Sequence, residues 1–364
     1  MRGTPPSTPG ARVSTYDRIA DLPLRIDGYS LEVRALSVGP EFRRLTTVIG
    51  LYGGGEEGVG EDVCYDPVEH ETQAAAGPIL PLSGECTLDE FSALLGGLDL
   101  FHAGAPALDA SRDYRRWAYE SAALDLGLRQ AGTTLADAIG RTPAPVRFVV
   151  STRLDDPPTA DRVTRWLARE PGLRFKLDPT DDWSPELVAQ LAGLGVVDVV
   201  DLKGQYGDEL PFGVALDPQT YRRVAEAFPE ALIEDPRLTP DLRAALAGHE
   251  DRVTWDAPIH SVDDILAREW PPRTVNMKPS RFGPLRRLFA AYDHLAANGI
   301  AAYSGGQTEL GPGRGQVQYL ASLFHPDAPN DIAPSGYNDP NPPDDLVASP
   351  LPVAIAPTGF RWGE

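Results

Sequence analysis

Short apolar runs alternate with amphipathic helical segments from Val146 onward, and this alternation limits the fold more than any other feature of the chain. It is typical of β/α units, in which strands form a parallel sheet and helices cover it. The helical segments include 160–169, 184–194, 218–228 and 284–298. The strand candidates span 147–152, 173–177, 196–202, 231–234, 252–256, 274–277, 300–304 and 332–334. Eight units are enough to close a β/α barrel, which is the fold class that we predict.

A doubly wound parallel sheet is the structural alternative for the same alternation. That fold would place a Gly-x-Gly-x-x-Gly turn directly after a strand, where it holds a dinucleotide. No such turn follows a predicted strand in this sequence. The glycine-rich stretch from Gly53 to Gly58 follows an antiparallel pattern and opens no helix. We interpret it as a mobile flap with a role in substrate specificity.

The first third of the chain has a different pattern and predicts a separate α+β domain. Residues 19–63 alternate apolar and polar side chains, as antiparallel strands do. Segments 87–98 and 114–139 have helical patterns, and the first opens with a capping sequence from Thr87 to Glu90. We expect a disordered leader at 1–15, the α+β domain at 16–142, the barrel at 143–336, and a C-terminal segment at 337–364 that returns to the first domain.

Lysine is almost absent, since 30 of the 33 basic residues are arginine. The three lysines, Lys176, Lys203 and Lys278, all fall at the ends of predicted strands. A buried lysine can lose its proton and act as a base or nucleophile, whereas arginine stays protonated. Because the active site of a β/α barrel lies at the carboxyl ends of its strands, these positions favour a chemical role for the lysines over chance.

Acidic residues end three successive predicted strands. Asp201, Glu234 and Asp256 each close an apolar run, so their side chains can converge on one point. A single acid in such a place is more often the cap of the next helix, but three in succession favour a metal site. Oxygen ligands suit a hard cation, Mg²⁺ or Mn²⁺, and the sequence has no cluster of histidine or cysteine that would bind zinc.

Lys176 and Lys278 occupy predicted strands 2 and 6, on opposite sides of the barrel. On either side of a metal-bound carboxylate, they suit abstraction of the neighbouring proton, with one lysine as base and the other as acid. Burial and a nearby Arg174 would lower the pKa of such a lysine. The competing structural explanation is an ion pair with one of the acids. Further residues predicted to bind substrate or support the site are Arg174, Asp178, Lys203, Arg281, Gln307 and Glu309.

Lys203 follows Asp201 by two residues and is the least easily assigned of the three lysines. It could pair with Asp178, touch the substrate, or occupy the edge of the metal site and weaken metal binding.

The formal net charge of −20 argues against DNA, RNA and anionic membranes as partners. It does not exclude an anionic substrate, because a bound divalent metal inverts the local field. No apolar run reaches eighteen residues, the N-terminus lacks the apolar core of a signal peptide, and two cysteines are too few for a disulfide framework. We expect a cytoplasmic protein that acts on a small molecule, and a homo-oligomer is compatible with this composition.

Together these motifs resemble the enolase superfamily, on its muconate-lactonising and o-succinylbenzoate-synthase side. Residues 118–140 are similar to the family's helix leading into the barrel, and Arg174-x-Lys176 is similar to its strand-2 motif of two basic residues. The three acids match the family's metal ligands, and Asn276-x-Lys278-Pro-Ser-Arg-Phe-Gly is similar to its strand-6 lysine motif. Residues 305–309 are similar to its strand 7. The resemblance covers residues 19–336, and it departs where Lys203 replaces a common asparagine and Ala257 a common acid.

The resemblance implies a modified TIM barrel with an α+β capping domain that closes over its mouth. It also implies Mg²⁺ and an enediolate formed from a carboxylate substrate, as in racemases, epimerases, cycloisomerases and dehydratases, so that the enzyme would be an isomerase or a lyase. A metal-independent Schiff-base lyase using Lys278 is the alternative enzyme. A non-catalytic binding protein, in which Lys203 has taken over the metal's charge, is the alternative without catalysis.

Overall fold

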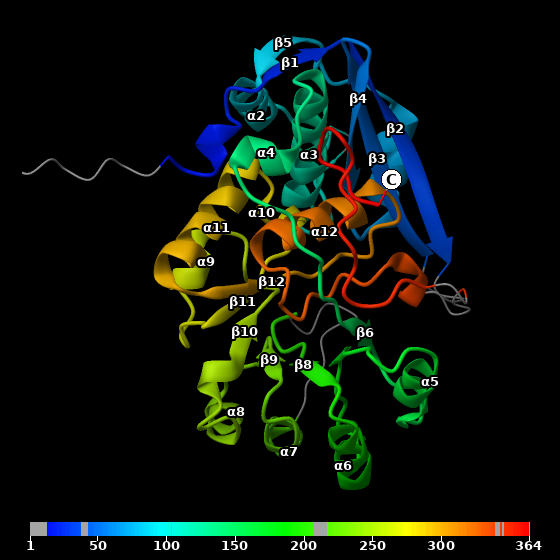
Figure 1. Cartoon of the computed structure of the whole chain (residues 1–364), viewed down its shortest axis with the longest axis vertical. Helices are drawn as coiled ribbons and strands as arrows, with labels where there is room; N and C mark the ends of the chain where they lie inside the picture. The colour runs from blue at the N-terminus through cyan, green and yellow to red at the C-terminus, as the bar shows by residue number, and fades with distance from the viewer. Residues whose placement is uncertain are drawn as a thin grey trace, which may run out of the picture.

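The computed structural model describes residues 13–37, 43–102, 104–206, 217–338, 343 and 346–363. Most of the leader predicted at 1–15 lies outside the described residues. Within this part of the chain, an antiparallel α+β domain sits above a parallel β/α domain (Figure 1). The predicted fold class, a β/α barrel with an N-terminal α+β cap, is confirmed.

In the described residues, the capping domain contains two antiparallel sheets and four α-helices. One sheet pairs β1 (Pro23–Ile26) with β5 (Gly84–Thr87), and the other has the order β2 (Gly28–Ser37), β3 (Arg43–Gly53), β4 (Glu56–Asp62). The helices are α1 (Pro67–Ala76), α2 (Leu88–Gly96), α3 (Ser111–Gln130) and α4 (Leu135–Ile139), after a short 3-10 helix at Tyr16–Arg18. Thr87 and Glu90 form the expected capping box of α2.

Helix α3 packs directly on β4 because two glycines let the backbones approach. A Cβ atom at Gly58 would lie 2.2 Å from the carbonyl oxygen of Ala122, and one at Gly60 would lie 2.0 Å from that of Ala118. No side chain fits at such distances. The close contact buries the centre of α3 between the capping sheet and the barrel.

The interpretation of the glycine-rich stretch as a flap is wrong. The stretch ends β3, turns at Gly54 and Gly55, both with positive φ, and enters β4 as a β-hairpin. The turn lies beside Gln130, at the last turn of α3, whereas Asp113 at the other end of α3 contacts Gly283 after α10. The hairpin tip therefore lies at the end of α3 that is remote from the barrel.

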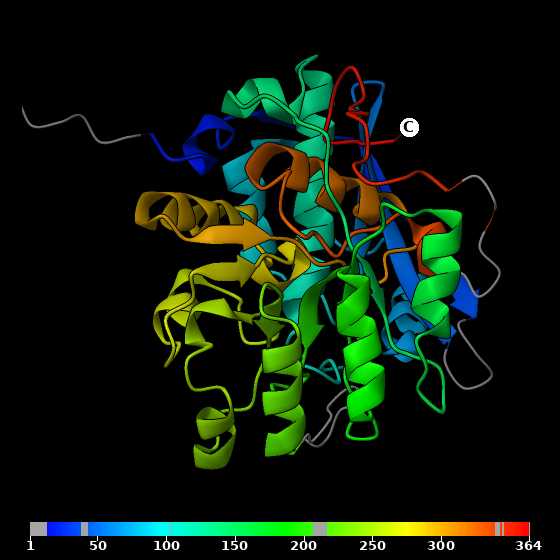
Figure 2. The ribbon, with the colours of Figure 1, turned by 60° about the horizontal axis from the view of Figure 1, so that its bottom comes forward.

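Seven parallel strands form the barrel sheet in sequence order (Figure 2). They are β6 (Val150–Thr152), β7 (Phe175–Leu177), β8 (Val197–Asp201), β9 (Leu232–Glu234), β10 (Val253–Trp255), β11 (Thr274–Asn276) and β12 (Ala301–Tyr303). The helices of this domain are α5 (Asp161–Arg169), α6 (Pro185–Leu194), α7 (Pro218–Ala227), α8 (Pro240–Ala245), α9 (Val262–Leu266), α10 (Pro279–Phe282), α11 (Leu285–Asn298) and α12 (Pro312–Phe324), with 3-10 helices at Glu250–Arg252 and Ser335–Asn338.

Three of the barrel helices start in the same way. Ser184, Asp217 and Thr239 cap α6, α7 and α8 through their side chains, and a proline follows each cap. A capping side chain satisfies a free backbone N–H, and proline at the first helical position has no N–H to lose. The first turns of these three helices are thereby stabilised.

The predicted eighth strand at 332–334 is not formed. Instead, Asn330 bridges Phe148 beside β6, and Asp331 bridges Gly305 after β12, both in parallel. These two residues take the eighth position of the ring and connect its two edge strands. Pro326, Pro329 and Pro334 flank them, and proline cannot donate to a strand ladder, so the pairing stays this short.

The C-terminal segment lies against the capping domain, beside α3 and β3 in Figure 1. Asp125 of α3 accepts the backbone N–H of Phe360 (2.7 Å) and the Arg361 guanidinium (2.8 Å). The Phe360 ring packs against Trp117 and Tyr319. Among the described residues, no helix combines the length and the apolar character needed to cross a membrane. Both cysteines, Cys64 and Cys86, are free thiols.

Candidate active site

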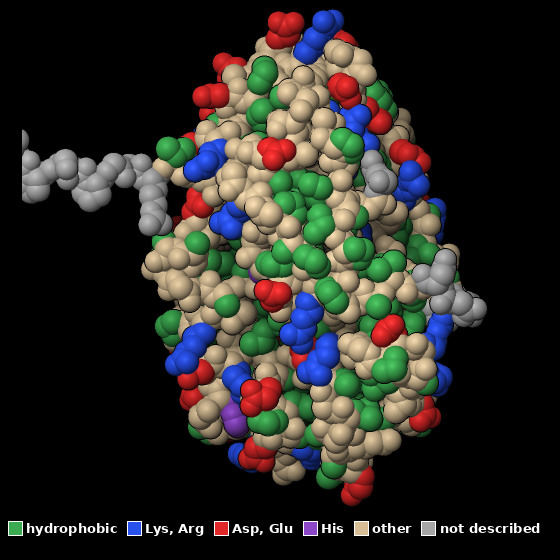
Figure 3. Space-filling model, in the orientation of Figure 1, with side chains coloured by type: hydrophobic (Ala, Val, Ile, Leu, Met, Phe, Trp, Pro, Cys, Tyr) green, Lys and Arg blue, Asp and Glu red, His purple; other side chains and the backbone are tan. Residues whose placement is uncertain are grey.

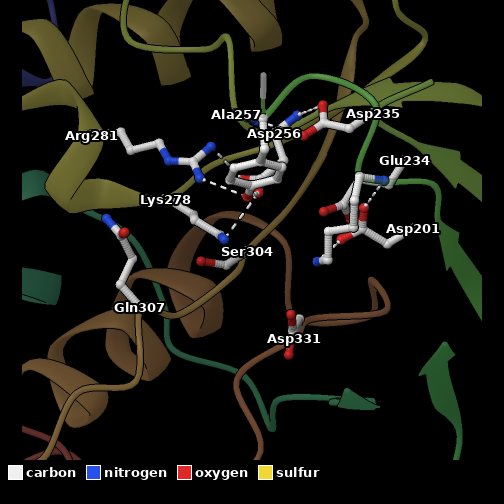
Figure 4. Close-up of polar contacts among 12 residues, drawn as sticks. Asp201, Glu234, Asp235, Asp256, Ala257, Lys278, Arg281, Ser304, Gln307 and Asp331 are labelled. Atoms are coloured by element: carbon white, nitrogen blue, oxygen red, sulfur yellow. Dashed lines mark hydrogen bonds and ion pairs between the residues drawn. The ribbon is translucent and has the colours of Figure 1, made fainter. Parts of the chain in front are cut away.

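Most of the predicted site residues lie at the carboxyl ends of the barrel strands, and Figure 4 shows several of them. Lys176 is the central residue of β7, Asp201 ends β8, and Glu234 ends β9. Asp256 directly follows β10, and Lys278 follows β11 by two residues. Strands β7 and β11 are separated by three strands, so the two lysines approach the centre from opposite sides.

Lys176 lies among three carboxylates. Its Nζ is 2.5 Å from Oε1 of Glu234, 3.0 Å from Oδ2 of Asp201 and 3.4 Å from Oδ2 of Asp331. Burial alone would lower the pKa of Lys176, but these carboxylates outweigh burial and raise it well above its ordinary value. The expectation of a lowered pKa is therefore wrong for this arrangement, because Arg174 is not near and acids surround the ammonium.

On the other side, Asp256 joins Lys278 to Arg281. Oδ2 of Asp256 is 3.0 Å from Nζ of Lys278, and Oδ1 is 2.9 Å from Nη1 of Arg281. The Tyr206 hydroxyl donates to Oδ2 of Asp256 (3.0 Å) and accepts from Arg281 (3.1 Å). Burial would raise the pKa of Asp256, but Arg281 and Lys278 hold it below its usual range. Asp256 therefore stays ionised in this network.

An acidic cluster lies between the two lysines. Carboxylate oxygens of Glu234, Asp235 and Asp256 all lie within 4.8 Å of one another, and all three residues are buried. Asp235 accepts the backbone N–H groups of Asp256 and Ala257, each at 2.8 Å. Burial, followed by the charges of Asp256 and Asp201, raises the pKa of Asp235 to about 7.

The strand ends carry backbone strain as well as charge. Among the described non-glycine residues, Lys203, Asp235 and Thr308 have left-handed φ values of +51°, +49° and +54°. Each follows the end of a barrel strand by no more than five residues. Such conformations persist where the surroundings fix them, and they concentrate at functional sites.

Lys203 contacts Asp201 through two of its own groups. Its backbone N–H donates to Oδ1 of Asp201 (3.0 Å), and its ammonium donates to Oδ2. Oδ1 of Asp178 lies 3.6 Å from the same ammonium. Asp201 thus contacts both Lys176 and Lys203, and although burial opposes it, the two ammonium groups lower the pKa of Asp201.

Three residues predicted for the site contact other parts of the barrel. Arg174 precedes β7 and pairs with Asp198 (Nε–Oδ1 2.9 Å) at the amino-terminal side of the sheet, so the structure does not bring it to the cluster. Glu309 accepts the backbone N–H of Gln307 and pairs with Arg314, which shapes the loop after β12. Gln307 donates to Ser280 (2.6 Å) and lies on the same side of the site as Lys278 and Arg281 in Figure 4.

Four residues of the site had not been assigned a role from the sequence. Asp331 contacts Lys176, Tyr303 donates to Oε2 of Glu234 (2.5 Å), Tyr206 contacts Asp256, and Asp235 belongs to the acidic cluster. Asp235 directly follows Glu234 and Tyr303 lies on a predicted strand, so inspection of every strand-end residue would have found both. Asp331 lies one residue before the predicted eighth strand at 332–334, so it was not considered as a strand-end residue.

The cluster fits a hard divalent cation. Its donors are carboxylate oxygens from adjacent strands, and Asp201 shares the ammonium of Lys176 with Glu234. Several carboxylates held together without a soft ligand match the preference of Mg²⁺ or Mn²⁺. Of the three predicted ligands, Glu234 and Asp256 belong to the cluster together with Asp235, whereas Asp201 lies beside it and is linked to Glu234 through the ammonium of Lys176.

Comparison with known proteins places both parts of the chain in one family. Residues 17–138 match the N-terminal domain, and residues 142–339 the C-terminal domain, of a domain of unknown function named DUF8230. The chain belongs to the DUF8230 family. The family boundary at residues 138–142 coincides with the passage from α4 into the barrel.

Solved structures of the enolase superfamily share the fold of this DUF8230 protein. A superfamily member from Listeria innocua is 18% identical, covers 93% of each chain and gives a TM-score of 0.65. A dipeptide epimerase from Enterococcus faecalis is 15% identical with a TM-score of 0.65 and covers 94% of this chain and all of its own. An o-succinylbenzoate synthase of Escherichia coli O6:K15:H31 is 26% identical over 303 residues, 78% of this chain and 82% of the relative. The resemblance to the enolase superfamily is confirmed at the level of the fold.

Proposed function

We propose that this protein is a divalent-metal-dependent enzyme that removes the α-proton of a small carboxylate substrate and forms an enediolate. The observation that carries the proposal is the placement of two buried lysines on opposite sides of one acidic cluster. The relatives with named activities include an epimerase and an o-succinylbenzoate synthase, so the outcome would be isomerisation or β-elimination. Formation of o-succinylbenzoate is the first reaction to test.

Asp201, Glu234 and Asp256 would hold Mg²⁺ or Mn²⁺, and the metal would stabilise the negative charge that develops on the substrate carboxylate. Lys176 and Lys278 would face the two sides of the α-carbon, one accepting the proton and the other donating a proton or stabilising charge. Tyr303 and Tyr206 each donate to an oxygen of Glu234 or Asp256, which fixes those carboxylates in place.

The residues around Lys278 are suited to the remainder of the substrate. Oε1 of Gln307 and both amide atoms of Asn276 are buried without a hydrogen-bond partner among the described residues. Asn276 lies against Gly305, beside the Lys278 side chain. We propose that Gln307 and Arg281 contribute to binding the substrate.

We also propose a cytoplasmic location, where reducing conditions keep the two cysteines as free thiols.

The experiment is turnover of a carboxylate panel by the metal-loaded protein, with EDTA-treated protein and the Asp256→Asn variant as controls. We expect turnover that requires metal and falls at least about a hundredfold in the variant, since one interaction made in the transition state is worth about this factor. Turnover that survives EDTA, combined with borohydride trapping of substrate on Lys278, would instead establish the Schiff-base lyase.

A further inference from the structure

Lys203 contacts the Asp201 carboxylate oxygens that a bound metal would need. One residue contacts both oxygens of this carboxylate, through its backbone N–H at Oδ1 and its ammonium at Oδ2. The left-handed backbone of Lys203 accompanies this arrangement, although lysine seldom adopts it. Oδ2 of Asp201 contacts the ammonium of Lys203 and also that of Lys176, the latter at 3.0 Å. A divalent ion on this oxygen would repel both ammonium groups strongly, so Lys203, which shares Asp201 through both of its oxygens, would have to move away.

Asp178 offers a second place for the same ammonium. Its Oδ1 is buried, has no hydrogen-bond partner among the described residues, and lies 3.6 Å from Nζ of Lys203. A charge-assisted hydrogen bond to a carboxylate is about 2.8 Å long, so a movement of about 1 Å would complete it. The buried, unpartnered oxygen is therefore positioned to receive Lys203 when Lys203 leaves Asp201.

We propose that Lys203 is a resident cation that sets the metal affinity of the site by moving between Asp201 and Asp178. Without metal it shares Asp201 with Lys176, and with metal it pairs with Asp178 at the edge of the site. The inference rests on the proposed function, because it takes the metal on Asp201 from there. Lys203 and Asp178 should therefore have opposite effects on metal affinity, because Lys203 competes with the metal and Asp178 relieves that competition.

The test is the affinity for Mn²⁺ itself, measured from the electron paramagnetic resonance signal of free Mn²⁺ in titrations of the wild type and variants. We expect Lys203→Asn to bind Mn²⁺ roughly tenfold or more tightly, and Asp178→Asn to bind it several-fold more weakly, within the range of couplings between contacting residues. In the Lys203→Asn background, the Asp178→Asn substitution should change the affinity less than about twofold. Asparagine suits position 203 because it tolerates left-handed backbone.

Two controls keep these outcomes separate. Arg174→Gln removes one positive charge from the amino-terminal side of the same barrel and should leave Mn²⁺ affinity unchanged, and Lys203→Gln repeats the charge removal with a longer side chain. Equal affinity of the wild type and both Lys203 variants, with unchanged circular dichroism, would overturn the role of Lys203. Equal weakening by Asp178→Asn in both backgrounds would make Asp178 a simple metal ligand and overturn the movement. If no variant binds Mn²⁺, the proposed function fails together with this inference.

Discussion

His325 gives the clearest quantitative expectation, because it supports the eighth position of the barrel from a fully buried site. Its Nδ1 is 2.7 Å from Oδ1 of Asn330, and its Nε2 is 3.1 Å from the Tyr292 hydroxyl. The Asn330 amide nitrogen donates to three backbone carbonyls, which leaves Oδ1 as an acceptor. The neutral ring with its proton on Nδ1 therefore satisfies both contacts, with Tyr292 donating to Nε2.

Burial lowers the pKa of His325 from 6.5 to about 4, against a small opposing effect of Asn330. The folded protein thus binds fewer protons than the unfolded chain between pH 6.5 and 4, so stability falls as the pH falls through this range. At about 1.4 kcal/mol for each pKa unit, the loss attributable to His325 is about 3 kcal/mol. The stability is fully present above pH 6.5 and its loss is complete below pH 4.

The assay compares the free energy of unfolding by urea of the wild type and the His325→Gln variant at pH 7, 6, 5 and 4.5. Glutamine cannot titrate, so the variant should be less stable at pH 7, by about 2 kcal/mol for the lost contacts. The difference should shrink and then reverse toward pH 4.5. Subtraction removes the contribution of other titrating groups, including the nearby Tyr292 and any carboxylate. Parallel loss of stability in both proteins across this range would refute the reasoning.

Two further substitutions test contacts of the site and of the domain interface. A Cβ atom at Gly305 would lie 2.5 Å from Cε of Lys278, so Gly305→Ala should displace this lysine. Turnover should fall at least about tenfold, with an unchanged far-ultraviolet circular dichroism spectrum. The control is Gly193→Ala, at a helical glycine with open space around it, which should leave turnover unchanged. Glu61 of β4 accepts the backbone N–H groups of Leu310, Gly311 and Gly313 at the start of α12, so Glu61→Ala should lower the free energy of unfolding by about 3 kcal/mol. Glu57→Ala on the same strand, with an exposed side chain, should change it by less than about 0.5 kcal/mol in urea titrations, and equal effects of the two would contradict the role of Glu61.

Much of the barrel could be predicted from the sequence because apolar runs alternate with helical segments, and three of the helices share the same start signal. An apolar run followed by a capping residue and a proline occurs at Ser184, Asp217 and Thr239, and all three start helices as such residues do. The eighth position carries no such signal. It is held by two bridges and by the buried contacts of Asn330, which depend on residues far away in the sequence.

The site could be predicted as a set of residues, but not as a set of contacts. The convergence of Lys176, Asp201 and Glu234 follows from their places at successive strand ends. The ion pairs that each charge makes do not follow from these places. Lys176 contacts Asp201 and Glu234 at two strand ends and Asp331 at an isolated bridge, whereas Arg174, two residues earlier, pairs with Asp198. The pairing of β7 with β8 also shifts register between Phe175 and Lys176, and no local sequence pattern predicts this shift.

The net charge of the chain does not show how its acidic side chains are distributed over the surface. On the face shown in Figure 3, acidic and basic side chains are interspersed around apolar ones. The net charge of −20 is thus not gathered into one acidic surface on that face. The carboxylates around Lys176 and Lys278 are a separate group, and the lysines together with Arg281 offset part of their charge.

We propose that Lys176 and Lys278 move the α-proton of a carboxylate substrate. The most direct measurement of this proton transfer is deuterium incorporation at the α-carbon, followed by proton NMR, when a carboxylate panel is incubated in D₂O with Mg²⁺ and the wild type, Lys176→Met or Lys278→Met. We predict incorporation by the wild type for at least one acid, and loss of at least about a hundredfold in the exchange rate for one or both variants. Incorporation that is equal in all three proteins, or absent from every acid with metal bound, would contradict the account.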